Sequence, residues 1–288
     1  VIGEVCSDED VIHQQNFSFC TLGDRDSDKS IVFYGDSHLQ SLQYSLDHQL
    51  RLGNIKGIWL REELECETTV FTTKSKNTSP QMLECPTNYV EALDYFADAD
   101  YLVLINRWSM KYFFPSSEII QPHFINEALG CEEKDAEYRD YLPLDTNGFK
   151  KPSDGSMAEA LVNLLEVSSS KLTTIVVYPV PEVGCDPYKY NLHHKKITGF
   201  ELEALSFPVE EYERRNEFVI SVFDEFYEQN KATVIPVRLR SAFCKRYDID
   251  ACVVIEDSVP FYFDDDHLSD TGADIVVKEI FKALERGN

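Results

Sequence analysis

The segment Ile31-Val32-Phe33-Tyr34-Gly35-Asp36-Ser37-His38 decides the fold predicted for this chain. Its first four residues form a short apolar, β-prone run, which is typical of a buried strand, and the run stops at Gly35. Apolar residues then recur at helical spacing from Leu39 to Leu50. The segment therefore predicts a strand, a tight turn and a helix.

The same alternation continues along the chain. Further candidate strands cover residues 55–60, 101–105, 173–178 and 232–237, and candidate helices cover residues 89–96, 157–167, 209–230 and 270–286. Residues 1–29 are polar and Asp-rich, and residues 110–155 have little periodicity, so we expect the latter to be an excursion from the core. The alternation predicts right-handed β-α-β units, and hence a three-layer α/β/α fold with a central parallel sheet of about five strands.

Length and composition favour one domain over residues 1–288. The chain has 288 residues and 43% hydrophobic content, which is enough for one large core. No stretch approaches the roughly 18 consecutive apolar residues of a membrane span, and the first residues do not resemble a signal peptide. Because the chain does not begin with Met, we expect it to be the soluble part of a longer protein. Its formal net charge of -24 argues against nucleic acid or an anionic membrane as partner.

Eight cysteines are scattered through the chain without zinc-site spacing. An even number of such cysteines favours disulfides and an oxidising compartment, whereas the alternative is eight buried thiols in a cytosolic enzyme. Proximity in the sequence favours the pairs Cys6–Cys20, Cys66–Cys85 and Cys244–Cys252. It does not assign Cys131 or Cys185.

Ser37 is the candidate nucleophile. It lies where the first strand ends and a helix begins, and there unpaired backbone N–H groups and the helix dipole can stabilise an oxyanion. Gly35 would let the chain turn sharply and let a substrate approach the backbone. The alternative is an ordinary capped helix start, with Asp36 or Ser37 as the N-cap.

The segment Asp264-Asp265-Asp266-His267 near the C-terminus supplies a candidate base and its orienting acid. A nucleophilic serine needs a base, and the base needs an acid that fixes its tautomer. An Asp three residues before a His can fold back onto Nδ1 and leave Nε2 for the serine, so we assign His267 as base and Asp264 as its partner. A solvated acidic run or a cation site is the alternative, and we assign no metal.

The remaining histidines have no such pattern. His38 is an immediate neighbour of Ser37, so we expect it to be structural or gating rather than the base. The adjacent His193 and His194 point in different directions, and we expect them to lie in a loop.

Together, the two motifs resemble those of the SGNH hydrolase superfamily, whose flavodoxin-like fold carries a Gly-Asp-Ser block near the N-terminus and an Asp-x-x-His block near the C-terminus. More closely, the chain resembles the SGNH domain appended to acyltransferase-three membrane proteins, which O-acetylate bacterial surface polysaccharides. The resemblance spans most of the chain, and its more specific parts are Arg107-Trp108 and the segment from Asp264 to Ser269.

The oxyanion hole is where the chain departs from the superfamily. The usual donors are the serine N–H, a Gly in the second block and an Asn in the third, but no Gly follows the strand that ends at Leu60. Asn106 or Arg107, at the end of the third strand, is the candidate donor, and strand termination is the alternative for both. Trp108 is a candidate for stacking on a sugar ring, although aromatic residues are more often core. In the strand order common to such folds, residues 31–34 and 101–105 are neighbours at the topological switch point, so these residues should face Ser37.

The resemblance implies a carbohydrate O-acetyltransferase that passes an acetyl group through a serine acyl-enzyme to a sugar hydroxyl, such as one of lipopolysaccharide O-antigen. It also implies a periplasmic or extracellular location, tethered to the membrane. No cofactor is expected in this domain, since the acyl group would come from acetyl-CoA through a membrane acyltransferase domain of the same parent chain. An acetyl esterase with the same triad is one alternative, and a non-catalytic carbohydrate-binding module is another.

Overall fold

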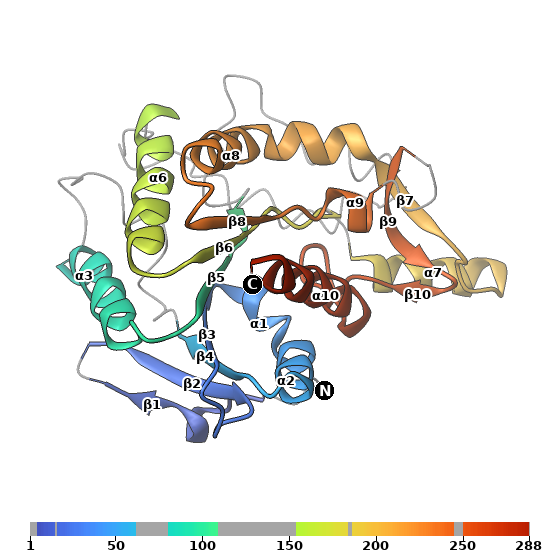
Figure 1. The fold of residues 1–288 in the computed structure, drawn as a ribbon. Helices are drawn as coiled ribbons and strands as arrows, with labels where there is room; N and C mark the ends of the chain where they lie inside the picture. The colour runs from blue at the N-terminus through green and yellow to red at the C-terminus, as the bar shows by residue number, and fades with distance from the viewer. Residues whose placement is uncertain are drawn as a thin grey trace.

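The computed structural model of the chain describes residues 5–14, 16–61, 80–108, 154–183, 186–244 and 250–287. Its larger sheet has the strand order β1-β2-β4-β3-β5-β6-β8 (Figure 1). The strands are β1 (Ile12–His13), β2 (Ser18–Gly23), β3 (Ser30–Gly35), β4 (Lys56–Leu60), β5 (Tyr101–Ile105), β6 (Thr174–Val177) and β8 (Val234–Val237). The expected excursion at residues 110–155 lies almost wholly outside the described residues.

Five of these strands form the predicted parallel sheet. In space they follow the order β4-β3-β5-β6-β8, and every neighbouring pair is parallel. Strand β3 is therefore flanked by β4 and β5, and Gly35 pairs with Ile105. This is the topological switch point at which ligands gather in open α/β sheets, so the predicted fold and its predicted neighbours are both confirmed.

The N-terminal segment adds two antiparallel strands that the sequence did not predict. Strand β2 pairs with β4, and β1 pairs with β2 at the edge. A disulfide joins Cys6 to Cys20, whose side chain is fully buried in β2. The polar composition of residues 1–29 hides this strand because it is only six residues long and its apolar side chains are those of Phe19, Cys20 and Leu22.

Helices cover both faces of the sheet. On one face lie α1 (Ser37–Gln40), α2 (Gln43–Leu52) and α10 (Asp270–Gly287), and on the other lie α3 (Pro80–Tyr95), α6 (Asp154–Lys171) and α8 (Val209–Gln229) (Figure 1). Consecutive residues of β3 alternate between the two cores: Ile31 and Phe33 pack toward the first, and Val32 and Tyr34 toward the second. Strands buried on both faces explain the continuous apolar runs of the sequence. Among the described residues, no helix is long and apolar enough to cross a membrane.

The single helix predicted after Ser37 is two helices. The first turn, α1, ends at Gln40, and α2 begins at Gln43. Leu39, Leu42, Leu46 and Leu50 still face the same core, which is why the apolar spacing looks continuous. Because α1 is only one turn long, the helix-dipole support expected for an oxyanion is reduced to the local N–H groups of that turn.

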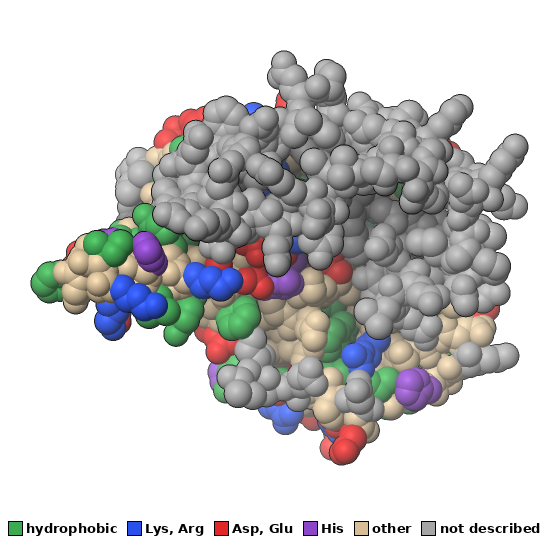
Figure 2. Space-filling view, turned by 180° about the vertical axis from the view of Figure 1, so that it is seen from behind, with side chains coloured by type: hydrophobic (Ala, Val, Ile, Leu, Met, Phe, Trp, Pro, Cys, Tyr) green, Lys and Arg blue, Asp and Glu red, His purple; other side chains and the backbone are tan. Residues whose placement is uncertain are grey.

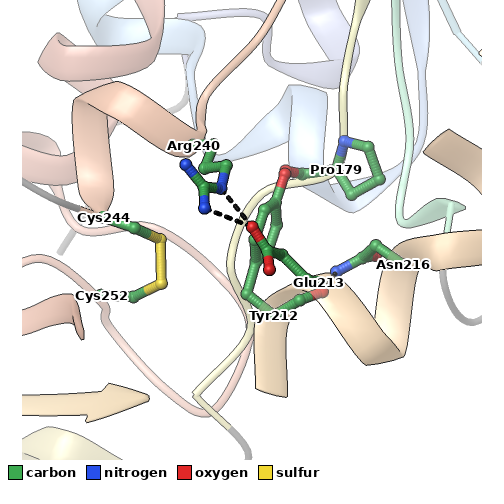
Figure 3. Close-up of a disulfide and its surroundings, with 7 residues drawn as sticks. All are labelled: Pro179, Tyr212, Glu213, Asn216, Arg240, Cys244 and Cys252. Atoms are coloured by element: carbon green, nitrogen blue, oxygen red, sulfur yellow. Dashed lines mark hydrogen bonds and ion pairs between the residues drawn. A yellow bond between two sulfur atoms is a disulfide. The ribbon is translucent and has the colours of Figure 1, made fainter. Parts of the chain in front are cut away.

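A smaller antiparallel sheet, in the order β10-β9-β7, was also missed. It consists of β7 (Leu205–Pro208), β9 (Ala251–Glu256) and β10 (Val259–Pro260). The short helix α9 (Arg240–Phe243) is joined to β9 by the disulfide Cys244–Cys252, which lies close to the Arg240–Glu213 ion pair (Figure 3). Two of the three predicted disulfides are thus confirmed. The Cys66–Cys85 pair, with Cys131 and Cys185, falls on residues or side chains outside those described.

Helix α7 (Pro187–Thr198) replaces the loop predicted around His193 and His194, so that prediction was wrong. Asp186 caps its N-terminus, and Gly199 ends it in the left-handed conformation. Of its described side chains, only that of Pro187 is buried. The helix projects from the body of the domain (Figure 1). On this projection, at the left of Figure 2, hydrophobic, cationic and histidine side chains intermingle. A mixed surface of this kind has no helical apolar period for the sequence to reveal.

We predict that Gly35→Ala lowers the free energy of unfolding by about 3 kcal/mol or more. A Cβ at this position would lie 1.8 Å from the Ile105 carbonyl oxygen, so β3 and β5 would have to separate. Gly35 has no positive φ, which corrects the expectation that it serves a sharp turn. Urea unfolding measures the loss. Gly199→Ala is the control, because it meets no atom within 4 Å and strains only its φ of 82°, at about 1 kcal/mol. Equal losses in the two variants would contradict the packing argument.

We also predict that Cys244 and Cys252 do not react with a thiol reagent in native protein that has never met a reductant. Their disulfide closes a loop of eight-residue separation directly before the segment that carries His267. Removing it by a double Cys→Ser substitution should cost about 2–4 kcal/mol of stability. Mass spectrometry after labelling, with and without prior reduction, checks the bond. Labelling of both residues without reduction would reject the pairing.

Candidate active site

Ser37 is separated from β3 by Asp36 alone and is the first residue of α1, with its side chain exposed. As the first helical residue, its N–H has no acceptor inside the helix. The hydroxyl and this N–H therefore lie together at the carboxyl end of the sheet. This is the arrangement that a serine nucleophile and one oxyanion donor require.

Asp36 holds the turn that presents Ser37. One carboxylate oxygen accepts the His38 N–H at 3.0 Å, which caps α1, and the other accepts the Arg107 N–H at 2.8 Å. The capped helix start, the alternative to a nucleophile site, is thus present, but capping by Asp36 leaves the Ser37 hydroxyl unused. The same carboxylate ties the end of β3 to the end of β5.

His267 is oriented by Asp264 as predicted from their spacing. Its Nδ1 lies 2.9 and 3.1 Å from the two Asp264 carboxylate oxygens, and its backbone N–H donates to the same group at 2.7 Å. The hydrogen bond that His267 Nδ1–H donates to Asp264 raises the pKa of His267 against the opposing effect of burial. Burial would raise the pKa of Asp264, but its hydrogen bonds to His267 and Asp266 outweigh that and lower it to about 2. Asp264 therefore stays ionised and leaves Nε2 available.

Asp266 is a second carboxylate beside His267. It is buried, and Oδ1 lies 3.4 Å from the Nδ1 of His267. Its other oxygen contacts the Nε2 of His38 at 3.1 Å. Asp264 is the closer partner, so the spacing rule selects the Asp that the structure places nearest, although Asp266 was assigned no role.

The serine segment and the histidine segment meet through His38. Its ring packs edge-on against that of His267, with centroids 5.8 Å apart. His38 is buried and engaged by Asp266, in agreement with a structural rather than a basic role. Among the described residues, no hydrogen bond joins the Ser37 hydroxyl to His267. Such contacts often tighten only when substrate binds.

Arg107 binds two buried carboxylates. Its guanidinium contacts the Glu182 carboxylate at 3.1 Å and the Asp266 carboxylate at 3.0 Å. Burial opposes the charged form, but the two carboxylates outweigh it and raise the pKa of Arg107. These two carboxylates are the buried partners that a charged side chain at the end of a buried strand requires. The oxyanion role of Arg107 remains a prediction.

Glu182 is buried between two arginines. Besides Arg107 it binds Arg215 of α8, with nitrogen and oxygen 2.5 Å apart. Burial would raise its pKa, but Arg215 and Arg107 together hold the pKa well below the ordinary value for a glutamate. The sequence signals for this residue were its place as the one Glu in an apolar stretch from Ile175 to Val183 and the Val180-Pro181-Glu182 segment, which is one of the supporting parts of the family resemblance.

Asn106 and Trp108 follow β5. Asn106 is buried next to the Arg107 peptide that binds Asp36, so it lies beside the serine turn, and its role as a donor remains a prediction. Trp108 is in the core. Its side chain is fully buried, its Nε1 donates to the Val177 carbonyl at 2.8 Å, and its ring packs edge-on against Phe223. Its predicted role in stacking on a sugar is therefore wrong.

The cation alternative rests on Asp264, Asp266 and His267, whose candidate ligand atoms all lie within 4.8 Å of one another. These atoms already have partners, however: Asp264 binds His267, and Asp266 binds the cation of Arg107. The geometry is accounted for by an orienting acid and a base without any ion. The second-block oxyanion donor would follow β4 and falls on residues outside those described.

Comparison with known families bears on this geometry. Residues 5–282 match the model of the SGNH domain fused to AT3 domains. The chain belongs to this family. The family recognition made from the two sequence motifs is thereby confirmed, and the SGNH domain described above carries both motifs at one end of its sheet.

Solved and curated proteins add little to the family match. A solved structure similar to this SGNH domain is the periplasmic domain of the lipopolysaccharide acetyltransferase of Salmonella ser. Paratyphi A. The two are 12% identical, with a TM-score of 0.49, over 91% of this chain and 85% of that chain. No curated protein has significant sequence similarity to the chain described here.

We predict that Arg107→Ala destabilises the SGNH domain. The change leaves Asp266 and Glu182 buried without one cation, and breaking a buried pair typically costs about 3–5 kcal/mol. Denaturant unfolding measures this loss. Arg214→Ala is the control, because Arg214 makes an exposed pair with Glu211 that should contribute about 1 kcal/mol or less. Similar small losses in both variants would show that the Arg107 pairs contribute little.

Proposed function

We propose that this SGNH domain is an acyltransferase that carries an acyl group on Ser37 and passes it to a hydroxyl of a surface polysaccharide. The observation that carries the proposal is the Asp264–His267 pair, held with Nδ1 bound to the carboxylate, in ring contact with the residue that follows an exposed serine. Nucleophile, base and orienting acid are the three parts of a serine acyl-transfer site.

The first half-reaction forms the acyl-enzyme. The Ser37 oxygen attacks the carbonyl carbon of the acyl donor, and its proton passes to Nε2 of His267. The tetrahedral oxyanion collapses with cleavage of the bond to the donor, and His267 returns the proton to the leaving group. Asp264 stabilises the imidazolium that exists between these steps, because its carboxylate stays ionised against Nδ1.

The second half-reaction regenerates the serine. His267 accepts the proton of the incoming hydroxyl, whose oxygen attacks the acyl carbon, and the proton then returns to Ser37 as its bond to the acyl group breaks. The Ser37 N–H is the first oxyanion donor in this scheme. We assign the second to the Asn106 amide, on the basis of its place beside the serine turn.

Family membership supports transfer over hydrolysis. A domain fused to AT3 domains is placed to receive its acyl group from a membrane partner, so acetyl-CoA would be the ultimate donor and this domain would need no cofactor. The confirmed disulfides support an oxidising location on the far side of the cytoplasmic membrane. A surface polysaccharide is the acceptor that such a location offers.

Hydrolysis is the second candidate, and the exposure of Ser37 favours it in the absence of acceptor, because water can then reach the acyl-enzyme. The two outcomes differ only in which hydroxyl attacks. A comparison of acetate released with acetyl transferred to added glycans separates them.

We predict that Ser37→Ala and His267→Ala each abolish acyl turnover, whereas Asp264→Asn lowers it less. A nucleophile and its base act as one unit, while the orienting acid is partly replaceable by its amide or by Asp266. Release of acetate from an acetyl ester measures turnover, and mass spectrometry detects the Ser37 adduct.

The matched controls are Ser221→Ala and His48→Ala, which remove exposed side chains of α8 and α2. Both should keep wild-type turnover. Retention of near wild-type rate by Ser37→Ala or His267→Ala would reject the triad, and a wild-type domain that never acquires a serine adduct would favour a binding module.

A further inference from the structure

A series of buried ion pairs connects α8 to His267, the proposed base. It starts at Arg215, which binds the Glu182 carboxylate, and Glu182 binds Arg107. Arg107 in turn binds Asp266 at 3.0 Å, and Asp266 lies 3.4 Å from the Nδ1 of His267. The sign of the charge alternates from each residue of this series to the next.

This series of ion pairs is well shielded from water. The side chains of Glu182 and Asp266 are 3% and 5% exposed, and those of Arg107 and Arg215 are 15% and 19% exposed. At such burial, charges act on one another more strongly and with less screening by salt than surface charges do. A change at the α8 end should therefore reach the imidazole.

We propose that Glu182 and Arg215 are positioning residues for His267, acting through Arg107 and Asp266. Neither contacts the reacting atoms. The role of His267 as base rests on the proposed function, but its electrostatic link to Glu182 and Arg215 does not.

The charged and titratable groups that face His267 come from three elements. Its own loop contributes a hydrogen-bonded carboxylate and a second one at 3.4 Å, α1 contributes a packed imidazole, and the segment after β5 contributes a guanidinium that opposes the charged form of His267. These groups are Asp264, Asp266, His38 and Arg107.

The two remote residues should act on His267 with opposite sign. Glu182→Gln removes a negative charge and lets Arg107 bind Asp266 more closely, so the imidazolium loses support and the pKa of His267 falls. Arg215→Gln removes a positive charge and leaves Glu182 to draw Arg107 away from Asp266, so the pKa of His267 rises. General loosening of the core would give no reason for the pKa of His267 to shift in opposite directions in the two variants.

The experiment is an NMR titration of His267 in the 288-residue chain labelled at histidine, with the His267 resonance assigned by its loss in His267→Gln. We expect a shift of about half a pH unit downward in Glu182→Gln and upward in Arg215→Gln. In the Glu182→Gln/Arg215→Gln double variant, which removes both charges of the pair, the pKa of His267 should be close to that of the wild type. Arg214→Gln, the neighbouring exposed arginine of α8, should leave the titration unchanged.

The acid limb of kcat/KM should move in the same directions, because the base must be neutral to accept the proton. Shifts of the same sign in both variants, or none in either, would overturn the proposal. If Glu182→Gln does not fold, Arg215→Gln and the double variant decide alone, by an upward shift and its reversal. A domain that shows the NMR shifts but no turnover would reject the proposed function and keep the electrostatic link.

Discussion

The active end of this domain depends on one carboxylate, that of Asp36. It binds the N–H of His38 and the N–H of Arg107, and so joins the first turn of α1 to the segment that follows β5. Because charge-assisted bonds to backbone N–H groups are short and directional, the nucleophile turn is held from both sides. Neither Asn, with one acceptor oxygen, nor Glu, with a longer arm, could make both bonds in the same geometry. Ser37 is placed by the residue before it rather than by its own contacts.

A second constraint is the pairing of buried charge. Four ionised side chains lie behind the serine and the histidine, and each has an opposite charge within hydrogen-bonding distance. Such a cluster is tolerated only when all its members are satisfied, since one unpaired charge in a low-dielectric site is costly. In a chain of net charge -24, the two arginines here are therefore committed to specific carboxylates.

The sequence predicted the parallel sheet, the switch point at β3 and β5, the Asp264–His267 pair and two disulfides, because each rests on a local pattern. Periodicity did not predict β2 or α7, whose apolar residues are few or mixed with polar and charged ones. It also missed the smaller sheet, although β9 contains a continuous apolar run at residues 251–255. Arg107 shows a different limit. Its position at a strand end was correctly recognised, but its partners Glu182 and Asp266 lie far away in sequence and are brought to it only by the fold. The core position of Trp108 likewise depends on α8, which no local pattern connects to it.

The halves of the site belong to different parts of the chain. Ser37 follows a strand of the larger sheet, His267 follows the smaller one, and the His38–Asp266 contact spans 228 residues. Each sheet can form from segments that are nearer in sequence, whereas this contact needs both to be in place. Because long loops close at an entropic cost before their contacts form, the contact between the serine segment and the histidine segment should be among the last features to assemble during folding. Regain of catalytic function would then mark completion of the native state more faithfully than regain of helical signal.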